Sequence, residues 1–221
     1  MLTFYYHPLS PVARRVWLAL LEKQIPFHPV LVDLRGEQNK PDFLAVNPFH
    51  HVPVIVEDEL KLIESLAILD YLEHAYPNVS LSPQSATAIA KMRMVQMVTT
   101  NELMPKLPSV ANLEVQPLTD KLRNELTTGL QFLEDQLGEK NYFGGDHLNL
   151  ADVVVGATVP LLFRLGIASE PYPRLKQWQE RLFTRDAWQK TEPNEDDFAR
   201  WKRYIQITIK RYQRQKLSQS S

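Results

Sequence analysis

Residues 47–55 have the sequence NPFHHVPVI, and Glu64 and Ser65 follow shortly after this stretch. Pro53 stands directly before the apolar run 54–56. Because a proline cannot donate to a sheet ladder, this position fits the first residue of a strand or an exposed sheet edge. We expect the Val52–Pro53 peptide bond to be cis. The backbone of Val52 would then be turned outward, free to pair with an extended ligand.

Ser65 begins a predicted helix. Apolar residues recur behind it at helical spacing, at positions 66, 68, 69 and 72. A helix N-terminus offers spare N–H groups and a serine hydroxyl adds a donor, so this end can bind an anion. Alone, the proline turn and the helix start are each typical of ordinary folding elements. Together, in this order, they indicate a site that holds a peptide and its carboxylate.

Composition excludes several classes of function. The chain has 221 residues, 44% of them hydrophobic, with 25 basic against 26 acidic residues, so no strong field indicates nucleic acid or a membrane surface as a partner. It has no cysteine, which excludes disulfides, thiolate metal sites and a cysteine nucleophile, and we expect no metal. The first residues show no secretory signal, and the longest strongly apolar run, 153–163, is far short of the roughly 20 residues of a membrane span. A cytoplasmic location is expected.

The chain divides by composition into two halves. The first, residues 1–79, alternates strand and helix patterns, and its opening strand–helix–strand predicts a parallel pair with a crossover. A Pro- and Ser-rich linker at 77–85 separates it from an all-helical half at 86–213, and we expect the polar tail 214–221 to be frayed. The predicted elements are strands at 2–6, 27–32, 54–56 and 60–63, and helices at 12–21, 41–46, 65–76, 86–107, 118–137 and 150–164, with two or three more helices after these.

The sharpest helix start in the second half lies at residues 148–153. Asn149 is the predicted N-cap and Asp152 occupies the third helical position, which is the pattern of a capping box. The helix that follows is apolar on almost every side, so we expect it to be buried, with a kink at Pro160. We assign this element a role in folding and no chemistry.

These features resemble the soluble (cytosolic-type) glutathione transferases over essentially the whole chain. The resemblance is carried by Asn47-Pro48 with Pro53, by Glu64-Ser65, by the loop 5–11 (YYHPLSP), and by the Asn149/Asp152 box. It implies an α/β thioredoxin-like N-terminal domain that binds glutathione, followed by an all-α C-terminal domain. It also implies a groove between them for a small hydrophobic electrophile, a homodimer, and a detoxifying conjugation reaction with a peroxidase side activity.

The resemblance also assigns the glutathione-binding residues. Val52, before Pro53, would pair its backbone with the cysteinyl part, Ser65 would hold the γ-glutamyl carboxylate, and Glu64 the amino group. His50 matches a histidine that serine-type members place near the glycyl carboxylate, and the adjacent His51 could substitute for it. Many insect-type members have an arginine directly after the Glu-Ser pair, where this chain has Leu66.

The reaction needs glutathione as its thiolate. Lowering a thiol pKa from about 8.5 by about two units takes roughly 2.7 kcal/mol of preference for the anion. Ser10, just before Pro11, matches the active serine of delta- and theta-type members, and the alternative is a plain N-cap. Tyr6 is the rival donor, since tyrosine-type members place theirs at the end of the first strand, although an aromatic there is also typical of a core. Arg14 would add positive potential near the sulfur or else face solvent.

The electrophile pocket is expected to draw on two segments and one distant aromatic residue. Three of the predicted pocket residues, Met97, Asn101 and Met104, share one face of the predicted helix 86–107, because they stand at positions i, i+4 and i+7. Packing at a domain or dimer interface explains that face equally well. The predicted pocket residues are Leu9, Val12, Met97, Asn101, Met104 and Trp201.

Three functions compete. The first is conjugation to electrophiles. The second is a glutathione-dependent isomerase of the maleylacetoacetate type, which carries a Ser-Ser-Cys loop where this chain has Leu9-Ser10-Pro11. The third is a non-catalytic binding or assembly module, for which the basic residues between Arg200 and Lys216 would serve. Intact Val52-Pro53 and Glu64-Ser65 favour glutathione binding over the third.

Overall fold

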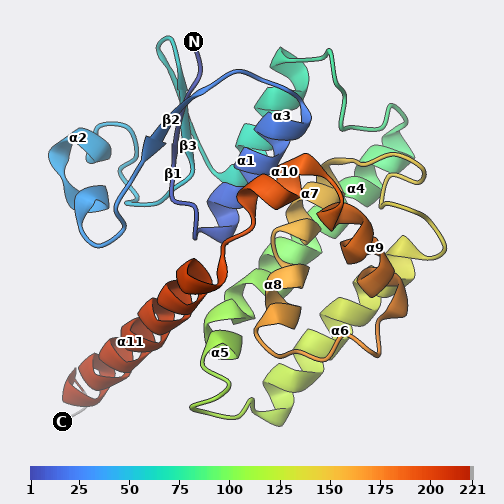
Figure 1. Cartoon of the computed structure of the whole chain (residues 1–221). Helices are drawn as coiled ribbons and strands as arrows, with labels where there is room; N and C mark the ends of the chain where they lie inside the picture. The colour runs from blue at the N-terminus through green and yellow to red at the C-terminus, as the bar shows by residue number, and fades with distance from the viewer. Residues whose placement is uncertain (220–221) are drawn as a thin grey trace.

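The computed structural model describes the backbone of residues 1–219 and the side chains of residues 1–211 (Figure 1). An α/β unit with one sheet is followed by a unit built from helices, and the chain crosses from one to the other once. The expected fold class is therefore confirmed.

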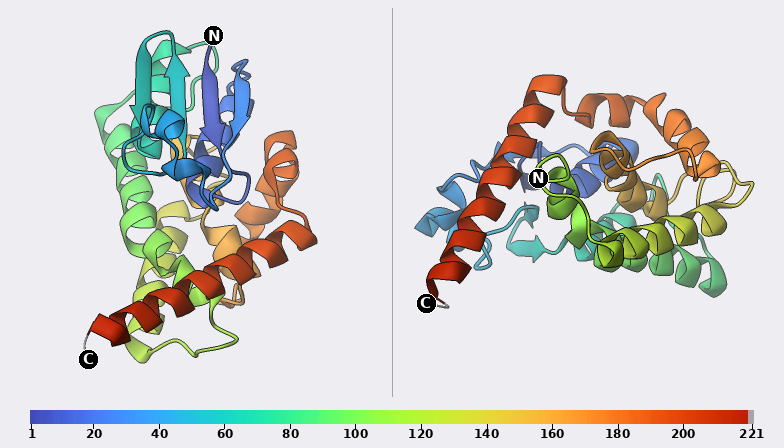
Figure 2. Two further views of the ribbon diagram at one scale, coloured as in Figure 1. Left: turned by 90° about the vertical axis from the view of Figure 1, so that its left-hand side faces the viewer. Right: turned by 90° about the horizontal axis from the view of Figure 1, so that it is seen from below.

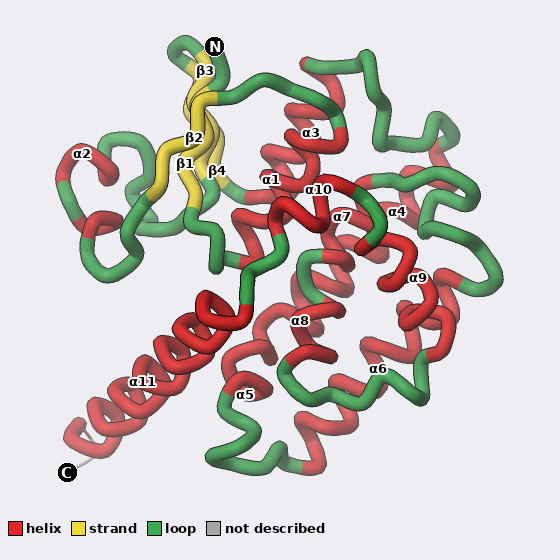
Figure 3. The backbone as a smooth tube through the Cα atoms, viewed as in Figure 1, coloured by secondary structure: helices red, strands yellow, loops and turns green. Residues whose placement is uncertain are grey.

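The sheet has four strands in the order β2-β1-β3-β4 (Figure 3). Strand β1 (Thr3–Tyr6) pairs in parallel with β2 (His28–Leu31) and antiparallel with β3 (Val54–Glu57), which forms a hairpin with β4 (Leu60–Ile63). The crossover from β1 to β2 is helix α1 (Pro11–Glu22), as the strand–helix–strand pattern predicted.

Helices cover both faces of this sheet. Helix α1 packs beside α3 (Ser65–Ala75) on one face, and the short α2 (Pro41–Leu44), preceded by the single turn η1 (Glu37–Asn39), lies on the other. The alternation of β1 is visible in its tyrosines: Tyr6 packs 5.1 Å from Trp17 of α1, whereas Tyr5 contacts Phe43 of α2. The two tyrosines therefore face opposite sides of the sheet, as the alternation of side chains along a strand requires.

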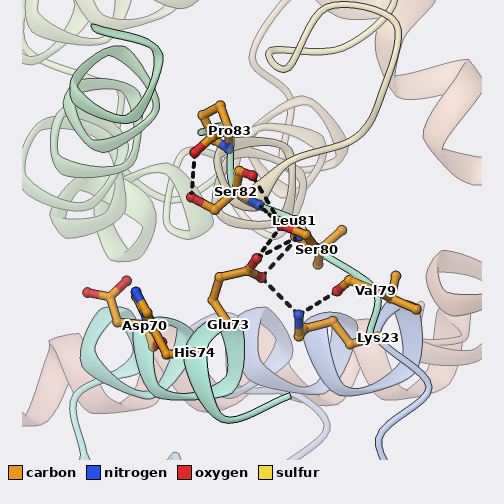
Figure 4. A network of polar contacts seen from close by, with 9 residues as sticks. All are labelled: Lys23, Asp70, Glu73, His74, Val79, Ser80, Leu81, Ser82 and Pro83. Atoms are coloured by element: carbon orange, nitrogen blue, oxygen red, sulfur yellow. Dashed lines mark hydrogen bonds and ion pairs between the residues drawn. The ribbon is translucent and has the colours of Figure 1, made fainter. Parts of the chain in front are cut away.

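A buried ion pair in the first unit also binds the linker by hydrogen bonds (Figure 4). Lys23, at the end of α1, lies 2.9 Å from the Glu73 carboxylate, and the Leu81 N–H donates to both oxygens of that carboxylate at 3.0 and 3.1 Å. The Leu81 carbonyl accepts from the Leu150 N–H at 2.8 Å. The linker is thus a hydrogen-bonded connection between the α/β unit and the helix that begins at Leu150.

The second half consists of helices in the described residues. The long helix expected at 86–107 was wrong in detail: it is divided into four pieces, because Pro105 and Pro108 lack the N–H groups that a continuous helix needs. The described elements are α4 (Ala86–Val98), the π-helical turn η2 (Thr99–Leu103), the turn η3 (Met104–Lys106), α5 (Leu107–Ala111), α6 (Asp120–Leu137), α7 (Leu150–Gly156), α8 (Val159–Arg164), α9 (Pro173–Phe183), α10 (Asp186–Thr191) and α11 (Glu195–Gln219).

Helix α7 is the centre of the helical half. The predicted capping box is present, with Asn149 accepting from the Ala151 N–H and Asp152 accepting from the Asn149 N–H at 2.8 Å. Asp152 also accepts from Trp178 Nε1 at 2.8 Å, and burial raises the pKa of this carboxyl to about 6. Every residue of α7 is buried, as expected.

The expectation about Pro160 was wrong. Pro160 breaks the helix instead of kinking it: α7 ends at Gly156, four residues before the proline, where the ring would meet the helix carbonyl, and α8 begins at Val159. The tail is helical as far as Gln219, since α11 continues through it (Figure 2). Three acidic residues in the first turn of α11 favour this helix by offsetting its dipole. Residues 220–221 lie outside the described residues.

Candidate functional site

Strand register brings three predicted segments to one end of the sheet. Tyr5 is opposite Val54, and Val54 is opposite Ile63. The same end of the sheet therefore carries the loop after β1, the turn before β3 and the residues after β4. These segments contain Ser10, the Val52–Pro53 turn and the Glu64-Ser65 helix start, respectively.

Ser10 is the N-cap of α1. Its Oγ accepts from the Ala13 N–H at 3.2 Å, and its own N–H donates to the His7 carbonyl at 2.9 Å. A serine hydroxyl that accepts one bond still has its proton to donate. The cap is therefore present, and it leaves the donor function of Ser10 available.

Tyr6 packs as an aromatic core residue. Its ring stacks on Phe4 at 5.0 Å and lies tilted against Trp17 at 5.1 Å. No hydrogen bond from its hydroxyl is found to the described side chains. These contacts hold the ring between β1 and α1.

The turn before β3 presents an unpaired backbone. The Val52–Pro53 peptide bond is cis, and Val52 makes no backbone hydrogen bond with the described residues. Asn47 shapes the turn: its Nδ2 donates to the His51 carbonyl at 2.7 Å. His50 is exposed with φ 61°, and its Nδ1 lies 2.9 Å from Asn39 Oδ1. His51 is exposed beside it.

Glu64 and Ser65 form the start of α3. Glu64 is exposed and has a φ of 66°, an uncommon value for a residue with a side chain. Ser65 is buried, and its Oγ accepts from Arg15 Nη1 at 3.4 Å. Sequence reasoning missed Arg15. Its signal was a second arginine in the otherwise apolar first turns of α1.

Arg14 is not on the surface, so the solvent-facing expectation was wrong. It is buried, pairs with the Glu192 carboxylate at 2.5 Å and donates from Nε to Thr191 Oγ1 at 3.2 Å. Burial lowers the pKa of the Arg14 guanidinium, and Glu192 opposes that shift. Arg14 thus joins α1 to the end of α10.

A narrow cleft of about 30 Å³ lies between the two units, next to Ser10. Of the six predicted electrophile-pocket residues, Leu9 and Trp201 line it, and Val12 does not. Sequence reasoning missed Leu161 of α8 and Phe198 of α11, which also line it. The full lining is Pro8, Leu9, Pro11, Arg14, Ala157, Leu161, Arg164, Glu192, Pro193, Phe198 and Trp201.

The predicted methionine face does not line this cleft. Met97 is 47% exposed, Asn101 is exposed, and Met104 is half-buried against the core. The π-helical turn Thr99–Leu103 lies between Met97 and Met104, and its extra residue per turn rotates the following residues away from the α-helical phase. The i, i+4, i+7 spacing therefore does not define one face here.

Two further observations apply to the described part of the chain. None of its helices combines the length and apolar character that crossing a bilayer requires. Among the described side chains, no three His, Asp or Glu residues gather in a group that could hold a metal ion.

The chain is similar to known proteins over most of its length. Residues 4–80 match the model of the glutathione S-transferase N-terminal domain, and residues 94–186 match that of the C-terminal domain. Glutathione S-transferase 3 of Zea mays is 35% identical, with 86% of this chain and 92% of the relative covered. A probable maleylacetoacetate isomerase of Caenorhabditis elegans is 29% identical, with 80% and 86% covered.

The fold is also found among solved structures. A delta-class glutathione transferase of Nilaparvata lugens superposes with a TM-score of 0.81 over 93% of this chain and all of that chain (100%), at 24% identity. At this identity the likeness shows the fold.

Proposed function

The chain belongs to the glutathione S-transferase family, and on that premise we propose that it conjugates glutathione to small hydrophobic electrophiles. The main support for this proposal is that three segments lie at the same end of the sheet: the loop with the Ser10 hydroxyl, the turn with the unpaired Val52 backbone, and the helix start at Ser65. A donor for a sulfur, a strand edge for a peptide and an anion site are the parts that binding and activating this thiol require.

Each residue has a role in this proposal. Val52 pairs with the cysteinyl backbone, Ser65 and its N–H hold the γ-glutamyl carboxylate, and Glu64 holds the amino group. His50 or His51 contacts the glycyl end. The exposure of Glu64 and both histidines supports these roles, because each side chain is free to reach a ligand.

The chemistry is thiolate formation followed by nucleophilic attack. The thiol proton goes to solvent, and the sulfur electron pair forms a bond to the electrophilic carbon. With an aryl halide the halide departs with the bonding pair, and with an isothiocyanate the C=N π pair moves to nitrogen, which takes a proton from solvent. Ser10 donates to the sulfur and the N-terminus of α1 adds a smaller share, together lowering the thiol pKa by about two units, or roughly 2.7 kcal/mol. The interior of the cleft, about 30 Å³, has room for no more than a water, so in this proposal the electrophile docks against its apolar lining residues Leu9, Phe198 and Trp201.

The second candidate is a glutathione-dependent isomerase. It is favoured by the similarity to a probable maleylacetoacetate isomerase. The loop Leu9-Ser10-Pro11 differs from the Ser-Ser-Cys loop of that type, which is why we prefer conjugation. The non-catalytic module is the weaker alternative, since the site segments are intact. A cytoplasmic location stays a prediction.

The test combines calorimetry with an ultraviolet titration of the bound thiolate. Wild type should bind glutathione with the thiol pKa lowered. Ser10→Ala should raise that pKa by about one to two units, corresponding to about 1.4–2.7 kcal/mol, with little change in affinity. If Tyr6 is the donor, Tyr6→Phe shows this pattern instead. No binding by wild type would reject the proposal.

An electrophile panel then separates the reactions. We would use an aryl halide, an isothiocyanate and a hydroperoxide, with maleylacetoacetate as the isomerase substrate. Turnover of the first two supports conjugation, and turnover of the hydroperoxide adds the peroxidase side activity. Isomerisation without conjugation would establish the second candidate instead.

A further inference from the structure

Arg15 is a buried cation whose hydrogen-bond partners are two hydroxyls. Only 1% of the residue is exposed. Nη1 donates to Thr100 Oγ1 at 3.0 Å and to Ser65 Oγ at 3.4 Å. Nε and Nη2 have no hydrogen-bond partner among the described residues. Burial lowers the pKa of this guanidinium to about 10.

Other buried cations of this chain are paired with carboxylates. Arg14 lies 2.5 Å from Glu192, and Lys23 lies 2.9 Å from Glu73. Arg15 makes no such ion pair within the described part of the chain. Since a charge removed from water is costly unless an opposite charge offsets it, Arg15 differs in kind from Arg14 and Lys23.

The place of Arg15 indicates which charge would offset it. Its guanidinium meets Ser65 at the N-terminus of α3, a helix of 11 residues whose first N–H groups also carry partial positive charge. Leu66, the next residue, adds no charge. The Arg15 guanidinium and the N-terminus of α3 repel each other, and together they attract an anion.

We propose that Arg15 is a positioning residue that sets the affinity for the γ-glutamyl carboxylate of glutathione. By donating to Ser65 Oγ, Arg15 occupies an acceptor position of that hydroxyl and leaves its single proton for the carboxylate. The buried charge then strengthens this bond, because hydrogen bonds in a chain polarise one another at low dielectric. This inference rests on the proposed function.

The test compares glutathione with an analogue that lacks only this carboxylate, γ-aminobutyryl-cysteinyl-glycine, by calorimetry. We expect wild type to bind glutathione more tightly than the analogue. Arg15→Met should weaken glutathione binding about 10-fold while the affinity for the analogue changes less than 2-fold, because only one ligand carries the anion. Arg93→Met, at a cation paired with Asp70 on α3, is the matched control and should leave the ratio of the two affinities unchanged.

The outcomes are distinguishable. Equal loss for both ligands on Arg15→Met, or no loss for either, would overturn the role of Arg15 and leave the proposed function intact. Failure of wild type to bind glutathione would overturn both. If the methionine variant does not fold, Arg15→Gln, whose amide can still donate to Thr100, should show the same selective loss. Arg15→Lys keeps the positive charge, so its ratio of glutathione affinity to analogue affinity should lie closer to that of wild type than the ratio of Arg15→Met does.

Discussion

The ion pair between Lys23 and Glu73 gives a prediction with a worked magnitude. Glu73 is 9% exposed and accepts from Lys23 Nζ, Ser80 Oγ and the Leu81 N–H. Glu73→Gln leaves Lys23 buried without a counter-charge, and breaking a buried pair from one side costs about 3–5 kcal/mol. Because glutamine keeps one acceptor oxygen, we expect the lower end, about 3 kcal/mol. For a chain of this size that lowers the melting temperature by about 6–12 °C.

The assay is thermal unfolding followed by circular dichroism, with Glu139→Gln as the matched control. Glu139 pairs with Arg174 but is 87% exposed, so this variant should melt within about 2 °C of wild type. A Glu73→Gln variant that melts as close to wild type as the control does would refute the reasoning. It would mean that Lys23 finds enough compensation in the Val79 carbonyl, to which it also donates.

The same pair predicts how the difference depends on pH. Burial raises the pKa of Glu73, but the bonds from Ser80, Lys23 and Leu81 outweigh it, so the pKa lies below its ordinary 4.5. A carboxyl whose pKa is lower in the folded state than in the unfolded state stabilises the fold at pH values above its unfolded-state pKa. It loses that contribution as the pH falls through its folded-state pKa. The gap between wild type and Glu73→Gln should therefore be constant from pH 6 to 8 and shrink below about pH 4.5. A gap that grew on acidification would contradict this.

Three further predictions concern Ser65, Asp152 and the assembly state of the chain. Ser65→Ala should weaken glutathione binding by about 1–3 kcal/mol in calorimetry, and unchanged affinity would place the carboxylate elsewhere. Asp152→Ala should destabilise the chain by more than about 3 kcal/mol in chemical unfolding, because it leaves the buried Asn149 and Trp178 donors and the partly buried Phe143 N–H without an acceptor; a loss under about 1 kcal/mol would show that water replaces it. Sedimentation should give a homodimer, and a species of 25.6 kDa at micromolar concentration would reject this.

Local patterns made much of the fold predictable. The strands at 54–56 and 60–63 and the Asn149/Asp152 box depend on residues near one another in sequence, so the pattern alone specifies them. The helix breaks were harder. Pro160 was seen, but whether a proline kinks or ends a helix depends on whether packing holds the two halves in line, and that is a tertiary property.

The candidate site was predictable where backbone geometry defines it. Val52 and Ser65 follow from a proline before a strand and a serine before an apolar stripe, whereas the role of Glu64 came from the family resemblance alone. The residues that lie between the two units were not predictable in this way. Phe198 and Arg164 reach the cleft from distant helices, and the phase of Met97 and Met104 depends on a π-helical turn that no helical periodicity indicates.

The tandem arginines of α1 connect the α/β unit to the helical unit. Arg14 and Arg15 are adjacent, so they point about 100° apart around the helix. Arg14 reaches Thr191 and Glu192 at the end of α10, and Arg15 reaches Thr100 in η2. Both arginines therefore contact residues of the helical half, and Ser10 is the N-cap of the same helix, α1. Without the helical half, Arg14 would lose Thr191 and Glu192, and Arg15 would lose Thr100.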